Sequence, residues 1–142
     1  MYHVMIFLHV VSALLLGSYV VFPFLAGRAG TLSGAAQESF VGLLRSFNRV
    51  GQFALIVAFI TGGALISNAK PSVAWMITAT VLLLIIGALS GMIGARTKKL
   101  LAAAKAGSNT ASDVGKIKSF SWIAAIVVIL AVLIMTNPQI LA

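Results

Sequence analysis

The stretch PSVAWMITATVLLLIIGALSGMIGA, residues 71–95, carries no charged side chain and decides the fold class. Three further uncharged stretches surround it, at 1–27, 50–69 and 119–142. A helix that crosses the hydrocarbon core of a bilayer needs about 20 predominantly apolar residues, because all of its backbone hydrogen bonds must be made internally. The sequence therefore predicts an all-α membrane protein with four spans.

Composition agrees with this fold class. Hydrophobic residues make up 61% of the chain and charged residues 8%, whereas about a quarter of the residues of a soluble domain are charged. We expect one transmembrane domain over residues 1–142, with spans at about 3–25, 48–67, 72–95 and 119–137. Pro23 is expected to kink or end the first of these helices near its inner end.

The basic residues indicate the orientation. Nine of the ten Lys and Arg residues lie in the first and third connections, and only Lys70 lies in the second. The nine are Arg28, Arg45, Arg49, Arg96, Lys98, Lys99, Lys105, Lys116 and Lys118. The positive-inside rule predicts an up-down-up-down four-helix bundle with both termini outside. Such a chain belongs in a bacterial-type cell membrane, where lipid headgroups and not nucleic acid balance its charge of +8.

Small residues at four-residue spacing mark expected helix crossings. Gly87 with Gly91, and Ser90 with Gly94, would let helix backbones approach closely, either within one subunit or in a homodimer. If Leu83 faces lipid, Gly91→Leu should disturb the bundle more than Leu83→Ala.

Several kinds of chemistry are disfavoured. The only carboxylates, Glu38 and Asp113, fall in the connections, whereas cation-coupled carriers usually place a carboxylate inside the membrane. The chain has no cysteine and no set of side chains resembling a hydrolase triad. No catalytic residues are predicted.

His9 is the only ionisable side chain expected within a span. Met5 and Ser12 share its helix face, since they lie four and three residues away. A neutral imidazole ligates haem iron or copper, and a thioether is a soft second ligand. We therefore predict a cofactor site at His9 and Met5, with a hydrogen bond from His9 to a neighbouring helix as the alternative.

Two weaker candidate sites lie near the membrane surfaces. The terminal amine of Met1 followed by His3 is a pattern that chelates copper(II), provided that the terminus is unwound. Arg45, Asn48 and Arg49 recur at helical spacing at the inner interface. Arg45 and Arg49 are predicted to contact a lipid phosphate, a haem propionate or a partner carboxylate, or to anchor the helix. Trp75 and Trp122 are expected in the outer and inner interfacial belts.

The segments LHVVSALLLGSYVVFPF at 8–24, RVGQFALIVAFITGGALI at 49–66 and KPSVAWMITATVLLLIIGALSG at 70–91 resemble small membrane proteins related to the copper-resistance D family. The resemblance implies haem or copper binding. Relatives that bind these cofactors carry further histidines in later helices, and this chain carries none, so a pair of histidine ligands from one subunit is not expected.

Three functions follow as expectations. The first is a membrane protein that binds haem b or copper in the outer half of the bundle, in redox chemistry or in metal or haem handling. The second is a non-catalytic accessory subunit of a larger membrane complex, with His9 as a hydrogen-bonding residue. The third is a carrier for a small solute.

Overall fold

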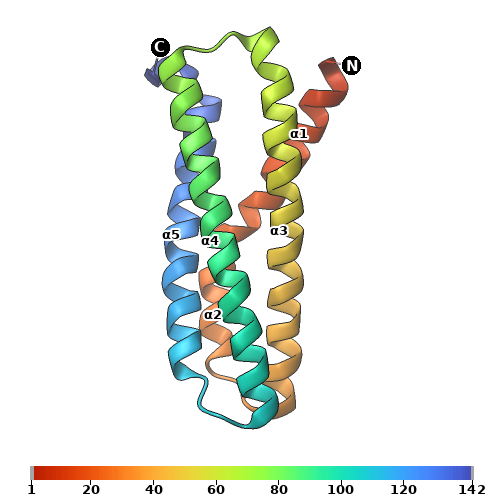
Figure 1. The fold of residues 1–142 in the computed structure, drawn as a ribbon, viewed down its shortest axis with the longest axis vertical. Coiled ribbons are helices and arrows are strands. Elements are labelled where there is room, and N and C mark those ends of the chain that lie inside the picture. The colour runs from red at the N-terminus through yellow and green to blue at the C-terminus, as the bar shows by residue number, and fades with distance from the viewer. Residues whose placement is uncertain (1, 142) are drawn as a thin grey trace.

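The computed structural model is an all-helical bundle with four long apolar segments (Figure 1). It describes residues 2–141, and at positions 67–69, 138 and 141 it describes the backbone alone. The helices are α1 (Tyr2–Leu16), the 3-10 helix η1 (Gly17–Val20), α2 (Phe22–Ala29), α3 (Gly34–Ala69), α4 (Val73–Ala106), α5 (Ala111–Thr136) and the 3-10 helix η2 (Pro138–Leu141). The predicted all-α bundle and its multi-pass character are confirmed.

The first span differs from the expected single helix. It consists of α1, the tight turn η1 and the short helix α2, so its regular helix ends after Leu16. Pro23 lies in the first turn of α2, one turn beyond the break. A proline ring clashes with the carbonyl four residues earlier, here that of Tyr19, and leaves that carbonyl without its helical partner. The break therefore lies one turn before the proline.

The other three helices are longer than the membrane requires. α3 and α4 continue past their apolar segments into the basic connections, and α5 begins two turns earlier than the predicted span. Two ends have clear local causes. The Ser72 hydroxyl accepts a hydrogen bond from the Trp75 amide at 3.1 Å and caps α4. Gly107, at φ +70°, ends α4 in the left-handed conformation that glycine adopts without strain.

The bundle is assembled from neighbouring helix pairs. α3 packs on α4 and α4 on α5, while α1 packs on α3 and α2 packs on α5. The break at η1 thus carries the first span from one side of the bundle to the other. Both chain ends and the α3–α4 turn lie at one end, which we name the outer end from the charge prediction (Figure 1). The α2–α3 and α4–α5 connections lie at the inner end.

A buried polar cluster joins three helical segments of the bundle. Tyr19 on η1 donates its hydroxyl hydrogen to Asn48 Oδ1 at 2.8 Å, and Asn48 Nδ2 donates to the Ser90 carbonyl at 3.0 Å. Tyr19, Asn48 and Ser90 are each at most 3% exposed. We call these three residues the polar clasp, because they connect η1 to α3 and α3 to α4.

The small residues contribute unequally to packing. A side chain at Gly87 would meet Leu55 at 3.2 Å, and one at Gly94 would meet Asn48 at the same distance, so both glycines lie at close crossings. Gly91 faces open space, whereas Leu83 is 8% exposed and belongs to the core. The placement on which the comparison of Gly91→Leu with Leu83→Ala rests is therefore wrong, because Leu83 is in the core and Gly91 lies on an open side of α4.

Candidate functional site: a cleft at the outer end

A cleft of about 370 Å³ opens between the helices in the outer half of the bundle. Its walls are mainly apolar, and His9 is the only titratable side chain among the lining residues. The lining residues are His9 of α1; Phe59, Gly62, Gly63, Leu65 and Ile66 of α3; Pro71 before α4; Trp75, Met76, Ala79, Thr80 and Leu83 of α4; and Met135 of α5. This volume lies in the range of small-molecule and cofactor sites, roughly 300–1,000 Å³.

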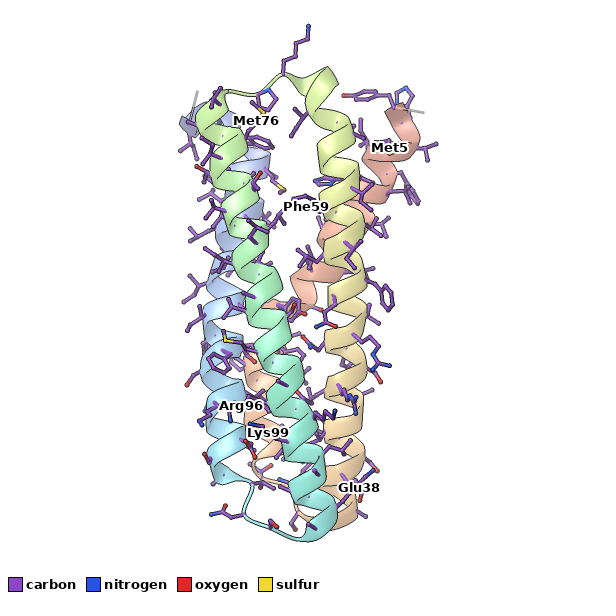
Figure 2. All side chains as sticks on the ribbon, in the orientation of Figure 1. Met5, Glu38, Phe59, Met76, Arg96 and Lys99 are labelled. Atoms are coloured by element: carbon purple, nitrogen blue, oxygen red, sulfur yellow. The ribbon has the colours of Figure 1, made fainter. Side chains whose placement is uncertain are left out.

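Two labelled side chains locate this outer cleft in the molecule. Phe59 and Met76 lie in the half of the bundle that holds the two chain ends (Figure 2). Glu38, Arg96 and Lys99 lie in the other half. The fixed charges of the inner end are therefore remote from the outer cleft.

The His9 imidazole is held against α3. Its Nδ1 lies 3.1 Å from the Ala58 carbonyl oxygen and 3.0 Å from Thr61 Oγ1. The Thr61 hydroxyl hydrogen goes to the Val57 carbonyl, 2.7 Å away. A side chain at Gly62 would meet His9 Cε1 at 3.2 Å, so the glycine leaves room for the ring.

These contacts favour one tautomer of the neutral His9 ring. A carbonyl oxygen can only accept a hydrogen bond, so Nδ1 must carry the proton that points to Ala58 and Thr61. In the neutral ring the lone pair then lies on Nε2. An imidazole whose Nδ1–H donates to a backbone carbonyl is the usual arrangement of a histidine that ligates a metal through Nε2. The hydrogen bond to a neighbouring helix and the ligand role are thus compatible.

The methionines that line the outer cleft are not the one that the sequence predicted. Met135 and Met76 line it, and Met5 is not among its lining residues, although Met5 is half-buried on the same helix as His9. Ser12, the other residue predicted on the His9 face, is buried and donates its hydroxyl to the carbonyls of Leu8 and His9. Sequence spacing could relate His9 only to its own helix, whereas Met135 comes from α5 through the tertiary fold.

Trp75 makes specific contacts within the bundle, beyond the interfacial position that the sequence predicted. Its indole Nε1 donates to the Ile134 carbonyl on α5 at 2.9 Å, and the side chain forms part of the wall of the outer cleft. The hydrogen bond joins α4 to α5 next to Met135. Trp122 is exposed near the inner end, and its ring makes an edge-to-face contact with the Phe24 ring.

The N-terminal copper pattern falls partly outside the structure. Met1 lies outside the described residues. His3 is in the first turn of α1, and its ring is 5.8 Å from that of Tyr2. Chelation through backbone amides would require this turn to unwind. Within the described residues, no group of three or more His, Cys, Asp or Glu side chains is arranged to hold a metal ion.

Arg45 and Arg49 lie on α3 toward the inner end, away from the outer cleft. Arg45 is half-buried and Arg49 is exposed, whereas Asn48 between them is 2% exposed and belongs to the polar clasp. The two arginines therefore do not share a site with Asn48. Their contact with a lipid phosphate or another anion stays a prediction.

Comparisons with known proteins returned no match to a family model, to a curated protein or to a solved structure.

Proposed function

We propose that this protein holds haem b in the outer cleft with His9 as a protein ligand, in a bacterial-type cell membrane, for redox chemistry or haem handling. The observation that carries the proposal is the position of His9 at the wall of the outer cleft, with its Nδ1 against the Ala58 carbonyl oxygen. Nδ1 is occupied by the Ala58 carbonyl and Thr61, so Nε2 is the nitrogen available to a ligand.

The surroundings of His9 suit a planar, mainly apolar group with a charged edge. Phe59, Trp75 and Leu83 provide apolar surface in the same cleft. Lys70, the one cation of the outer connection, immediately precedes the lining residue Pro71. A cation in this connection would suit a ligand that carries carboxylates. Bound haem would supply one-electron chemistry, while the protein would orient it and exclude water.

The resemblance to proteins related to the copper-resistance D family supports a cofactor role for His9. The segments that carry it include His9, Trp75 and much of the α3 wall of the outer cleft. Haem held by one histidine of the subunit is consistent with the absence of histidines after position 9.

Copper(I) is a second candidate, favoured by one observation. Two thioether side chains, Met76 and Met135, line the same cleft as the His9 imidazole. Imidazole and thioether groups suit the soft copper(I) ion. A copper site would use these donors and would not need the volume of the outer cleft, which is the reason to place haem first.

The proposal predicts a haem complex that depends on His9. Purified protein in detergent, titrated with hemin, should give a Soret band that saturates at one haem per chain. His9→Ala should weaken hemin binding by more than about 100-fold, because losing even an outer-shell partner of a metal ligand costs roughly 10- to 100-fold. His3→Ala is the matched control, since His3 lies outside the cleft, and it should bind like the wild type.

Circular dichroism should show that His9→Ala keeps the helical content of the wild type. A Soret band of unchanged intensity in His9→Ala would contradict the proposal. His9-dependent binding of copper(I) without hemin binding would favour the copper site. Protein that binds neither probe would leave the accessory subunit or the solute carrier as the better interpretation.

A further inference from the structure

The exposure of the lining residues shows where the outer cleft opens. Three of these residues are exposed, Phe59 and Gly63 on α3 and Thr80 on α4. Ala79 and Leu83, which also line the cleft, are buried. The cleft therefore reaches the surface between α3 and α4, and its inner wall lies toward the core. We call Phe59, Gly63 and Thr80 the cleft mouth.

The cleft mouth lies at the depth of the membrane interior. At 1.5 Å per residue, Phe59 and Gly63 lie about 16 Å and about 10 Å below Lys70, which ends α3. Thr80 lies about 12 Å below Ser72, which caps α4. All three residues belong to the apolar segments that are long enough to cross a bilayer. The opening therefore faces lipid chains and not the headgroup region.

The surface beside the cleft mouth is apolar on both helices. Ile60, next to Phe59 on α3, is 64% exposed, and Ile77, next to Met76 on α4, is 59% exposed. Among the residues that line the cleft, His9 is the only titratable one, so its walls carry no permanent charge. The walls of the cleft thus continue the surface that the bilayer covers.

The packing of α3 on α4 is close below the cleft and open beside it. Gly87 and Gly94 of α4 lie at close crossings, against Leu55 and Asn48 of α3. Toward the outer end the two helices diverge (Figure 1), and a Cβ atom at Gly63 would meet nothing within 4 Å. An empty apolar space leaves its wall atoms without van der Waals partners, and water needs polar partners to occupy it. A lipid chain supplies the missing contacts.

We infer that an acyl chain of a neighbouring lipid enters the outer cleft between α3 and α4 and fills it when no other ligand is bound. This inference goes beyond the proposed function and does not depend on haem. It also assigns the class of ligand that reaches His9, which is an amphiphilic molecule dissolved in the bilayer that replaces the lipid chain through the cleft mouth.

The experiment uses Trp75, which lines the outer cleft, as a fluorescent reporter. The chain has two tryptophans, so Trp122→Phe leaves Trp75 as the only one. This protein is reconstituted without hemin in phosphatidylcholine vesicles with or without bromine on the acyl chains, where bromine quenches fluorescence on contact. Brominated chains should quench Trp75. Adding Gly63→Leu should remove most of this quenching, because the new side chain occupies the cleft mouth.

Gly91→Leu on the same background is the matched control. Gly91 is also an exposed glycine whose Cβ would meet nothing within 4 Å, but it does not line the cleft. It should leave the quenching of Trp75 unchanged, and circular dichroism should show equal helical content in both glycine variants.

Two results would overturn the inference. One is equal quenching by brominated chains in the Gly63→Leu and Gly91→Leu proteins. The other is quenching of Trp75 by aqueous iodide and not by brominated chains, which would mean that water fills the cleft. Because hemin is absent from these measurements, neither result depends on whether His9 binds haem.

Discussion

At the scale of single residues, Gly51 shows how closely the first span approaches α3. A Cβ atom at this position would lie 2.6 Å from the Tyr19 hydroxyl oxygen and 2.7 Å from Cε2 of the same ring. Tyr19 is 1% exposed, and its hydroxyl is hydrogen-bonded to Asn48, so the ring has no free space to move into. Glycine at position 51 is therefore required by the contact and not by its backbone angle.

Gly51→Ala should lower the free energy of unfolding by about 1–3 kcal/mol, because overpacking of a filled interior costs this amount. Gly42→Ala on the same helix is the matched control, since its Cβ would meet nothing within 4 Å. That substitution should be neutral or stabilise by up to about 1 kcal/mol, the difference in helix propensity. Thermal unfolding in detergent measures both. Equal shifts would contradict the close contact with Tyr19.

At the scale of elements, the break in the first span determines where the outer cleft can form. α1 lies along α3, but α2 lies along α5, and η1 makes the crossing between them. His9 therefore reaches the outer cleft from the α3 side, while the lower part of the same span fills the other side of the bundle. The polar clasp keeps the crossing in place through Tyr19 and Asn48.

Asn48→Ala should destabilise the bundle by about 1–2 kcal/mol. It removes the shorter of the two acceptors of the Tyr19 hydroxyl, leaving the backbone carbonyl of residue 48 at 3.3 Å, and it removes the donor to Ser90. Hydrogen bonds between membrane helices contribute about 0.6 kcal/mol on average and up to about 1.7 each. Ser46→Ala is the control, because its exposed hydroxyl donates only to the Gly42 carbonyl of its own helix. Denaturant unfolding in micelles should show the difference. A similar, small effect of both variants would mean that the polar clasp does not hold the crossing.

At the scale of the whole molecule, the surface is what a bilayer requires. Large apolar side chains are exposed along α1, α3, α4 and α5, whereas the buried interior contains many small residues such as Ala54, Ala58, Ala124 and Ala131. Nine of the ten basic residues lie toward the inner end, where Arg96 and Asp113 form an ion pair at 3.8 Å between α4 and α5. The fold alone is compatible with either orientation in the membrane. The distribution of the basic residues predicts which of the two is adopted.

The topology prediction can be tested with two cysteine variants in intact cells. Gln139→Cys lies beyond α5 near the C-terminus, and Ser108→Cys lies in the connection after α4, at opposite ends of the bundle (Figure 1). Both positions are exposed, and the protein has no native cysteine. Because nine of ten basic residues lie inside by prediction, only Gln139→Cys should react with an impermeant maleimide. Labelling of Ser108→Cys alone would mean that the protein has the opposite orientation.

The amino-acid sequence by itself determined the helical fold and its four long apolar segments. It also singled out His9 as the candidate ligand within a span. These features depend on the lengths of apolar segments and on local backbone chemistry, which operate within one helix. Pro23 indicated a break in the first span, although the interruption lies one turn earlier, at the carbonyl that its ring displaces.

Only the tertiary structure decided which side of each helix faces the bundle. Leu83 is inside and Gly91 is outside, and Met135 lines the outer cleft together with His9, whereas Met5 does not. Lipid and protein interior are both apolar, so hydropathy does not distinguish a lipid-facing leucine from a buried one. The partners of His9 on α3 follow from helix packing between distant segments, and no spacing within one helix encodes them.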